Sequence, residues 1–456
     1  MAPARKSNRA SVSSRTHVVL VPGFAGFDAL GQMEYYAGVT PHFGEWKQAG
    51  GRERQAVVLH YFDNFPTASV ATRSKRLRSY LAKRLARGEF LPGDKIALVG
   101  HSTGGLDIRR LLWDLAADHE ADAKARYAVD GTQGSPFAVA PLEILKIVDR
   151  VVFLSVPQFG TNIADWVRVH APGRYAVIAD LRASIATSQV PVLDRLQDWL
   201  TRSIAGAVDL DLCDALQDAL SEAEPPLNDD ALRKLLAQEA ASELALWLRH
   251  ICSDFSAIDD LSAEPGGDAE SPAHFSDADR AREMAIWKQH RVFTKSYASL
   301  GARPFDFDPE HDAPQWELLN PSSWPETTPP TSAKAGTDIV YRTCYRACAG
   351  GPFEYPDVNM TTPTVLADEN GEERTLAVWD NDGIVNTASM LWPNLDTTTL
   401  VNADHMDMVG HFRRVRCPDP DSGREYDAYD LLKSGSGFDA NTFAKVWDEV
   451  FDFCVG

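Results

Sequence analysis

The sequence predicts a mostly parallel α/β sheet flanked by helices and interrupted by a large helical insertion. Short apolar stretches alternate with helical patterns over residues 16–160, leucine-rich helical patterns replace them over about 165–290, and strand-like stretches resume afterwards. The chain has 456 residues. One hydrophobic core seldom grows beyond roughly 250–300 residues. We therefore expect one catalytic core that carries an insertion, or two domains.

The strands are predicted from short apolar stretches that are bounded by turn residues. The early candidates are His17–Val21, Ala56–Phe62, Ile96–Val99 and Val151–Val156, and the late ones are Val292–Ala298, Ile339–Tyr345, Thr375–Trp379 and Thr398–Val401. Between the second and third strands, apolar residues recur every three or four positions from Val70 to Leu85, which predicts a helix. The basic residues on its other face, Arg73 among them, are expected to be solvated.

These patterns divide the chain into four parts. We expect a disordered basic tail over residues 1–15, a first part of the core over 16–164, a helical cap or lid over 165–290, and a second part of the core over 291–456. Amphipathic helices in the cap would cover the cleft and offer apolar surface to an acyl chain.

Composition excludes several classes of protein. No apolar stretch approaches the roughly 18–20 residues of a membrane span. The net charge of −20 disfavours a nucleic-acid binder, which needs excess Lys and Arg. No apolar stretch follows the basic start as in a secretory signal, so we expect a cytoplasmic protein. Six cysteines are too few for a disulfide scaffold, and Cys344 and Cys348 are expected to be reduced thiols.

The motif that indicates chemistry is Gly100-His101-Ser102-Thr103-Gly104, which lies between a predicted strand and a predicted helix. This is the G-x-S-x-G pattern in the strand–turn–helix context that it requires. A serine at the apex of such a turn has a strained backbone, so small neighbours are needed on both sides. The pattern predicts Ser102 as a nucleophile.

A serine nucleophile needs a base and an acid that orients it, and in this fold they follow the serine in the order acid, then histidine. The only histidines after residue 311 are His405 and His411, and His405 is favoured because it directly follows a predicted strand. Asp382 and Asp380 both precede it in a sharp turn, and spacing alone does not separate them. The oxyanion hole is expected to use the backbone N–H of Thr103, after the nucleophile, and that of Phe24, which lies between glycines after the first strand.

Several of these segments resemble the bacterial triacylglycerol lipases of the α/β-hydrolase fold. The resemblance lies in LVPGFAG at 20–26, MEYYAGV at 33–39, LSVPQFGT at 154–161, NDGIVNTASM at 381–390 and DHMDMVG at 404–410. Pro22 and Gln158 stand where the family usually has histidine. The resemblance covers roughly residues 16–165 and 375–412, and it implies Asp382 as the acid and His405 as the base.

The resemblance implies further properties. An insertion in the middle of the chain acts as a lid in this family. A structural calcium uses an acid two residues after the catalytic histidine, which makes Asp407 a candidate ligand. No histidine-bearing insertion of the kind that binds zinc in some members is present. The family is secreted, whereas we expect no leader in this chain.

The expected function is therefore that of a serine esterase or lipase, which hydrolyses carboxylic esters through an acyl-enzyme and requires no cofactor. A small-molecule or lipid ester is the expected substrate. The same triad would serve a polyester depolymerase or an acyltransferase, and a catalytically silent α/β-hydrolase that acts as a binding module is the alternative from another class. The oligomeric state is not indicated by the sequence.

Overall fold

The computed structural model describes most of the two core parts of the chain. The described residues are 14–121, 139–170, 256–262, 271–304, 307, 339–350, 364–412, 415–418, 425–428 and 430–456, except residues 25, 27–28, 31–32, 92 and 433. The greater part of the predicted cap, residues 171–255, lies outside them, so the cap stays a prediction. The same holds for the first thirteen residues of the predicted tail.

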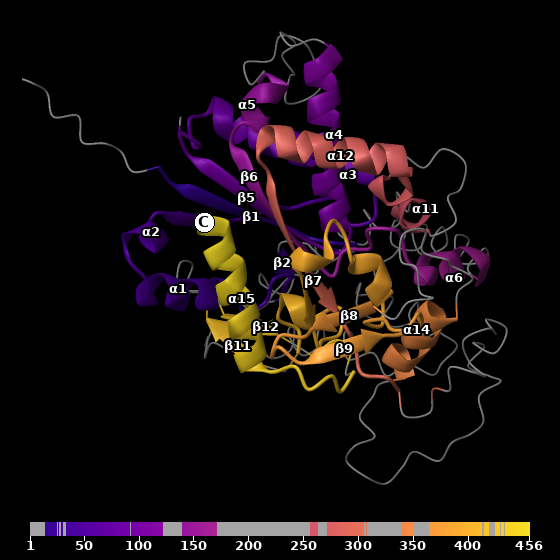
Figure 1. Cartoon of the computed structure of the whole chain (residues 1–456). Coiled ribbons are helices and arrows are strands. Elements are labelled where there is room, and N and C mark those ends of the chain that lie inside the picture. Colours follow the sequence, from indigo (N-terminus) through magenta and orange to yellow (C-terminus); the bar gives the residue numbers. More distant parts are fainter. Residues whose placement is uncertain are drawn as a thin grey trace, which may run out of the picture.

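A six-stranded parallel sheet forms the centre of the molecule (Figure 1). Its strands are β1 (Thr16–Val21), β4 (Val57–Tyr61), β5 (Lys95–His101), β6 (Val148–Leu154), β7 (Phe293–Ser299) and β10 (Thr398–Val401). They lie in the order β10-β7-β6-β5-β1-β4, and every neighbouring pair is parallel. Because parallel strands need crossover connections, helices cover both faces of the sheet.

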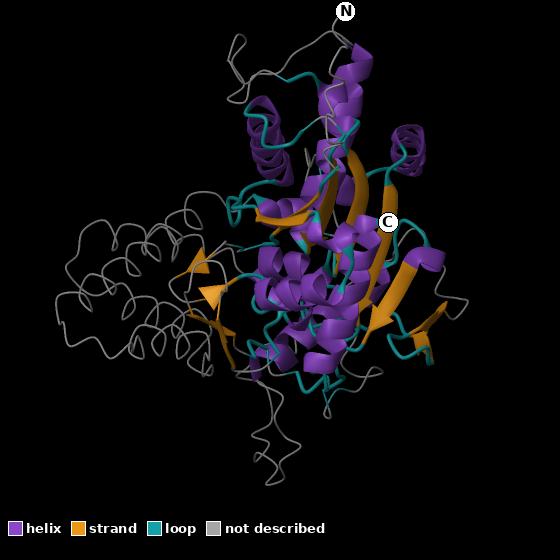
Figure 2. Cartoon of the chain, turned by 90° about the vertical axis from the view of Figure 1, so that its left-hand side faces the viewer, coloured by secondary structure: helices purple, strands orange, loops and turns teal. Residues whose placement is uncertain are grey.

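One face of the sheet packs against four helices, which are α3 (Val70–Ala86), α4 (Thr103–Ala121), α5 (Pro141–Leu145) and α12 (Asp277–His290). The other face packs against α1 (Val39–Ala49) and α15 (Ala440–Val455). Figure 2 shows the sheet between these layers. Within β1, Val19 and Val21 belong to the first core cluster, whereas Val18 and Leu20 belong to the second. Alternate residues of a strand point to opposite faces, so a strand that is covered on both faces is apolar throughout.

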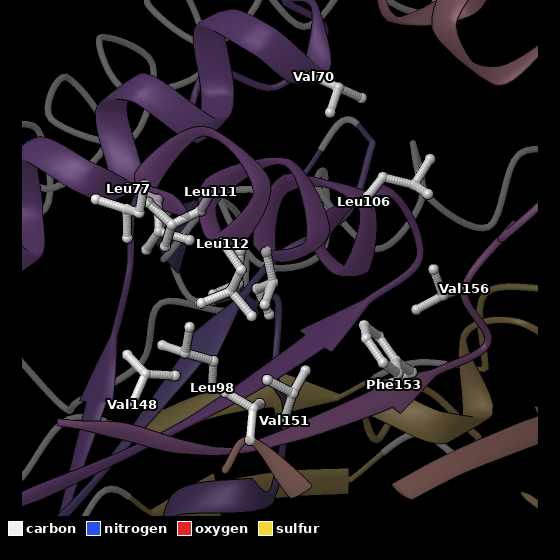
Figure 3. Packing of buried hydrophobic residues seen from close by; sticks show 14 of the residues in the cluster. Val70, Leu77, Leu98, Leu106, Leu111, Leu112, Val148, Val151, Phe153 and Val156 are labelled. Carbon is white, nitrogen blue, oxygen red and sulfur yellow. The ribbon is translucent and has the colours of Figure 1, made fainter. Parts of the chain in front are cut away.

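The first core cluster fills the space between α3, α4 and the sheet (Figure 3). Leu106, Leu111 and Leu112 of α4 lie over Leu98 and Val151 of the central strands, and all five are fully buried. This packing fixes α4 over the middle of the sheet, with its first residue next to the end of β5.

The remaining elements are short. Three two-stranded hairpins are β2 (Ala29–Leu30) with β3 (Met33–Glu34), β8 (Thr364–Ala367) with β9 (Glu373–Leu376), and β11 (Val415–Pro418) with β12 (Glu425–Ala428). The other helices are α2 (Arg52–Gln55), α6 (Asn162–His170), α11 (Ala257–Leu261) and α14 (Ile339–Ala349), and the 3₁₀ turns are η1 (Pro272–His274), η4 (Thr387–Met390), η5 (Leu395–Thr397) and η6 (Asp407–Val409). Among the described helices, none has the length and hydropathy of a membrane span.

The sheet has the strand order and the crossover pattern of the α/β-hydrolase fold, so the predicted fold class is confirmed. One predicted strand is wrong: residues 339–345 belong to α14. β-Branched and aromatic residues suggested a strand there, but Tyr341 and Tyr345 are four positions apart and are both buried on one face of the helix. The predicted strand at Thr375–Trp379 is only β9, an arm of a hairpin outside the main sheet.

A buried ion pair joins α12 to α4. Arg109 donates from Nε and Nη2 to the two carboxylate oxygens of Glu283, at 2.9 and 2.8 Å, and both side chains are fully buried. Arg109 Nη1 also donates to the backbone and side-chain oxygens of Gln158. Although α12 lies within the range predicted for the cap, it packs against the core.

We expect Glu283→Ala to destabilise the protein by about 3–5 kcal/mol, because the Arg109 charge would remain buried without its partner. A second ion pair between the same two helices provides the control. Arg282 contacts Glu120 at 2.7 Å, but both side chains are about half exposed, and Glu120→Ala should cost less than about 1 kcal/mol. Chemical denaturation monitored by tryptophan fluorescence would measure both, and equal costs would contradict this account of Glu283.

Candidate active site

The candidate residues lie at the carboxyl edge of the sheet, where its strand order reverses. From β1 the chain moves outward to β4 and then returns to the other side of β1 as β5. In open parallel sheets, ligands bind in the crevice outside the carboxyl ends of the strands at such a point. Ser102 follows β5, Phe24 follows β1, and His405 follows β10.

Ser102 is the single residue between β5 and α4, and its backbone is left-handed, with φ of +53°. Its surroundings explain the glycines of the motif. A Cβ atom on Gly104 would lie 2.3 Å from the carbonyl oxygen of Val21, and one on Gly100 would lie 2.6 Å from the backbone nitrogen of Gly105. The turn therefore exists only because both positions lack a side chain. Its strain is held in place by the packed strand and helix on either side.

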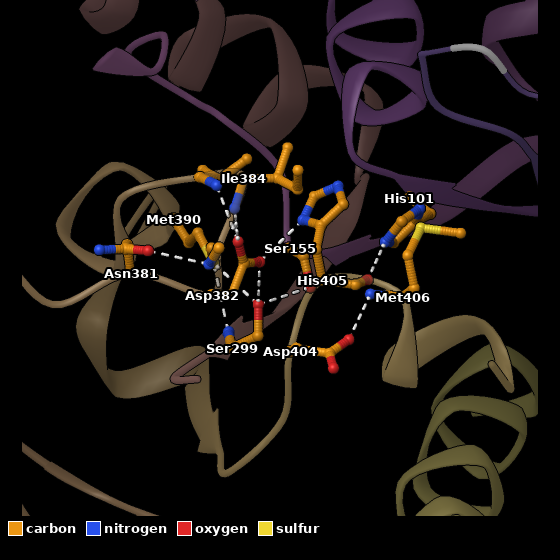
Figure 4. Close-up of polar contacts among 12 residues, drawn as sticks. His101, Ser155, Ser299, Asn381, Asp382, Ile384, Met390, Asp404, His405 and Met406 are labelled. Atoms are coloured by element: carbon orange, nitrogen blue, oxygen red, sulfur yellow. Dashed lines mark hydrogen bonds and ion pairs between the residues drawn. The ribbon is translucent and has the colours of Figure 1, made fainter. Parts of the chain in front are cut away.

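His405 and Asp382 are joined by a hydrogen bond. His405 Nδ1 lies 2.7 Å from Asp382 Oδ2, and the backbone nitrogen of His405 donates to the backbone oxygen of Asp382 at 3.1 Å (Figure 4). Both side chains are buried. A carboxylate only accepts hydrogen bonds, so the proton of a neutral His405 lies on Nδ1 and its Nε2 carries the lone pair.

Asp382 is held by donors on both carboxylate oxygens. Oδ1 accepts from the backbone nitrogens of Ile384 and Val385, at 2.9 and 2.7 Å. Oδ2 accepts from the hydroxyl of Ser299 at 2.6 Å in addition to His405. The Ser299 hydroxyl also contacts that of Ser155 at 2.8 Å. A buried carboxylate with this many donors is stabilised as an anion in a fixed orientation.

The residue before Ser102 connects the turn to His405. His101 Nε2 donates to the backbone oxygen of His405 at 2.9 Å, and the two rings have centroids 4.6 Å apart (Figure 4). Because His101 and Ser102 are consecutive, the structure places His405 beside the turn that carries the serine.

The loop after β1 contacts the same turn. A Cβ atom on Gly23 would lie 2.6 Å from Cβ of Ser102, so only glycine allows this approach. Phe24 follows directly and is half-buried against the first core cluster. Thr103 begins α4 and is fully buried, so its backbone N–H is at the positive end of the helix dipole.

Arg73 was expected to be solvated, and that expectation is wrong. Its side chain is fully buried and forms an ion pair with Asp107 at 2.9 Å. Nη2 donates to the backbone oxygens of Pro22 and Gly23, at 2.7 and 3.1 Å. In a trans peptide the C=O and N–H groups point in opposite directions. Because Arg73 holds the Gly23 oxygen, the N–H of Phe24 points away from Arg73.

The two alternatives left open by spacing have other contacts. Asp380 accepts a hydrogen bond from the backbone nitrogen of Ala377 at 2.7 Å, which closes its own turn. His411 Nε2 lies 3.0 and 3.2 Å from the backbone oxygens of Glu34 and Tyr35. The structure joins Asp382 to His405, and it records no bond between His405 and Asp380 within the described residues.

The surroundings of Asp407 do not fit a calcium ion. Its Oδ2 accepts hydrogen bonds from the backbone nitrogen of Asp404 and the hydroxyl of Ser436, both at 2.8 Å. Ca²⁺ takes six to eight oxygen ligands. The described residues contain no group of three or more His, Cys, Asp or Glu side chains that is suited to a metal.

Four residues of this region were missed by the sequence reasoning: Arg73, Tyr35, Ser155 and Ser299. Arg73 was assigned to the basic face of the helix, although it lies three residues after Val70 and four before Leu77, which is the spacing of the buried face. Ser155 also has a left-handed backbone, with φ of +50°, directly after β6. Nothing in the sequence around a serine that follows a strand indicates that it will contact Ser299, which donates to Asp382.

The comparisons with known proteins return structures but no sequence relatives. No family model matches the chain, and no curated protein matches it. Among solved structures, lipase 1 from Pelosinus fermentans is 16% identical with a TM-score of 0.42, and the match covers 96% of this chain and 98% of that one. A metagenomic carboxyl esterase is 15% identical with a TM-score of 0.35, over 97% and 76% of the two chains. A mature Bacillus licheniformis lipase is 12% identical with a TM-score of 0.33, over 87% of each. Likenesses this distant carry no argument about activity, which rests on the site itself.

Asp404 and Asp407 form a buried pair of carboxylates next to His405. Burial raises the pKa of Asp404 to about 7 and that of Asp407 well above its usual range, and the charge of Asp404 adds to the rise in the pKa of Asp407. A raised pKa means that the native state keeps a proton that the unfolded chain releases. This pair should therefore lower the free energy of unfolding as the pH rises from about 4 to about 7, by up to about 1.4 kcal/mol per pH unit for each proton held.

Asp407→Asn should reduce this decline, because the amide oxygen can still accept both hydrogen bonds without a charge. Thermal unfolding from pH 4 to pH 8 would measure the difference between the variant and the wild-type protein. The exposed Asp396 provides a control, and Asp396→Asn should leave the pH dependence unchanged. Parallel curves for Asp407→Asn and the wild type would contradict the assignment.

Proposed function

We propose that this protein is a serine hydrolase of carboxylic esters. The observation that carries the proposal is the Asp382–His405 hydrogen bond at the carboxyl edge of the sheet, beside the strained turn of Ser102. A serine hydroxyl is hardly ionised at neutral pH, so it becomes a nucleophile only next to a base that is held in one tautomer. The hydrogen bond to Asp382 holds His405 in the tautomer that such a base needs.

In the first half of the reaction, Ser102 Oγ attacks the ester carbonyl carbon while His405 Nε2 takes the hydroxyl proton. The carbonyl oxygen becomes an oxyanion and accepts hydrogen bonds from the backbone N–H groups of Phe24 and Thr103. The intermediate then expels the alcohol, which receives the proton from His405. An acyl-enzyme on Ser102 remains.

In the second half, water replaces the alcohol. His405 takes a proton from the water, which attacks the acyl carbon, and the carboxylic acid leaves as Ser102 regains its proton. The buried Asp382 anion stabilises the imidazolium that forms in both halves. Its four hydrogen bonds, two of them from backbone nitrogens, hold this charge in place.

Two alternatives share this triad. An acyltransferase differs in the acceptor of the acyl group, which is an alcohol instead of water, whereas a polyester depolymerase also uses water and differs in its substrate. Product analysis with an added alcohol tests the first: free acid as the main product supports hydrolysis, whereas an alcohol ester would move the proposal to an acyltransferase. Release of soluble acids from a polyester film would support the second.

Ser102→Ala should lower the turnover of a p-nitrophenyl ester by about ten-thousand-fold or more, because no acyl-enzyme can form. An organophosphate should add to the wild-type protein at Ser102 and leave the variant unlabelled, as measured by peptide mass spectrometry. Ser74 is a buried serine of α3, and Ser74→Ala should keep both the turnover and the label. Full turnover in Ser102→Ala would rule the proposal out.

Asp382→Asn should lower kcat by about 10³–10⁴-fold with little change in KM, because the amide no longer fixes the His405 tautomer or stabilises its cation. Asp380→Asn is a matched control. Asp380 is buried in the same turn and accepts its hydrogen bond through one oxygen, which an amide oxygen can also do. Steady-state kinetics of both variants would show which acid serves the reaction, and a larger loss of kcat for Asp380→Asn would contradict the assignment of Asp382.

A further inference from the structure

Two buried side chains, Tyr35 and His101, connect the three loops that carry the proposed reaction. The Tyr35 hydroxyl lies 2.9 Å from the backbone nitrogen of Gly23 and 2.6 Å from His101 Nδ1. His101 Nε2 lies 2.9 Å from the backbone oxygen of His405. A continuous series of hydrogen bonds therefore runs from the loop after β1, past the serine turn, to the loop after β10.

The direction of every bond in this series follows from its two ends. The His405 carbonyl can only accept, so a neutral His101 carries its single proton on Nε2 and presents a lone pair at Nδ1. Tyr35 then donates its hydroxyl proton to Nδ1 and accepts from the Gly23 N–H, which can only donate. With a neutral His101, no second arrangement of protons satisfies all three contacts.

Burial keeps both side chains neutral. His101 is fully buried and Tyr35 nearly so. Loss of solvent lowers the pKa of His101 well below its usual value, and the nearby His405 and His411 lower it further. The same loss of solvent raises the pKa of Tyr35 far above its usual value. A protonated His101 would have no lone pair for the Tyr35 hydroxyl. The series therefore keeps one protonation pattern across the neutral pH range.

The backbone of Tyr35 is fixed independently of its hydroxyl. His411 Nε2 lies within hydrogen-bonding distance of the Glu34 and Tyr35 carbonyl oxygens. Gly410 is left-handed, and a Cβ atom there would collide with the backbone oxygen of Ala37. The segment after His405 thus packs directly against the segment that carries Tyr35. The hydroxyl is held at a set position relative to both loops.

We propose that Tyr35 and His101 form a positioning relay, which sets the Phe24 N–H, Ser102 and His405 relative to one another for the attack on the ester. This inference rests on the proposed function. Each of the three loops in contact with the relay contributes one of these groups: Gly23 precedes Phe24, His101 precedes Ser102, and the third contact is with His405 itself. Because the relay only positions these groups, breaking it should destabilise the transition state more than it weakens substrate binding.

Tyr35→Phe removes the hydroxyl alone and tests the relay. We expect kcat for a p-nitrophenyl ester to fall about 10–100-fold with KM within about two-fold, since small errors of position cost that much. The rate of organophosphate addition to Ser102 should fall in parallel, while the final extent of labelling stays complete.

Tyr36→Phe is the matched control. Tyr36 is also buried, and its hydroxyl donates a short hydrogen bond, of 2.6 Å, to the backbone oxygen of Val21 in β1. It also interacts with the backbone of His101 but not with the His101 ring, so it lies outside the series of bonds. The variant should lose a similar amount of thermal stability but keep kcat within about two-fold. If Tyr35→Phe and Tyr36→Phe lower kcat equally, Tyr35 has a structural role only and the proposal is wrong.

A double-mutant cycle tests whether the two residues act together. His101→Leu should reduce kcat as Tyr35→Phe does, and the double variant should lose little more than either single variant, because each breaks the same series of bonds. His101→Gln retains an amide N–H that can reach the His405 oxygen, so it should keep more activity than His101→Leu. If the double variant loses kcat by the product of the two single losses, and His101→Gln is no more active than His101→Leu, the relay is wrong.

The proposed function and the relay fail in different ways. Absence of ester turnover and of Ser102 labelling in the wild-type protein would refute both. An active wild-type protein whose Tyr35→Phe variant keeps its full kcat would refute the relay alone.

Discussion

The strained backbone of Ser102 is the constraint on which the rest of the site depends. A left-handed serine between β5 and α4 brings the strand, the helix and the loop after β1 so close together that a Cβ atom at Gly23, Gly100 or Gly104 would collide with its neighbours. Such strain of the order of 1–3 kcal/mol persists only where surrounding structure over-determines it. Here the surrounding structure is a central parallel strand, bonded on both sides, and a helix with a fully buried apolar face. The stability of the two layers therefore holds the serine in its left-handed conformation.

Around that turn, buried polar contacts hold the surrounding loops and helix α12 in place. Arg73 holds the loop after β1 through its carbonyl oxygens, Asp382 holds the loop after β10 through His405, and Arg109 with Glu283 holds α12 against α4. A buried polar group without hydrogen-bond partners lowers the stability by several kcal/mol, so each of these groups favours the one arrangement in which its partners are present. Apolar packing of the same loops would allow many arrangements. The buried polar groups thus confer a unique geometry on the site more than they add stability.

The sequence predicted the parallel sheet because its strands, covered on both faces, are apolar throughout, as in residues 18–21. It also predicted the serine turn, because the whole G-x-S-x-G pattern lies within five consecutive residues, between an apolar stretch and a helical pattern. The assignment of Arg73 failed for the opposite reason. Its partners Asp107, Pro22 and Gly23 lie far away in sequence, and a basic residue among Lys75, Arg76 and Arg78 is expected to be solvated unless the fold brings an acid to it. Likewise, residues 339–345 have strand-forming residues, but their tyrosines are buried by tertiary contacts that favour a helix.

The neutrality of His101 matters as much as its hydrogen bonds. Its ring lies 4.6 Å from that of His405, so a positive charge on His101 would oppose the imidazolium that His405 forms in the proposed reaction. Burial lowers the pKa of His101 well below its usual value, and the Tyr35 hydroxyl occupies the nitrogen that a second proton would take. In the proposed reaction a cation forms on His405, in direct contact with the Asp382 carboxylate. A lysine or arginine at position 101 could also donate to the His405 carbonyl, but its fixed charge would oppose that cation. A buried neutral histidine supplies the hydrogen bond without that charge.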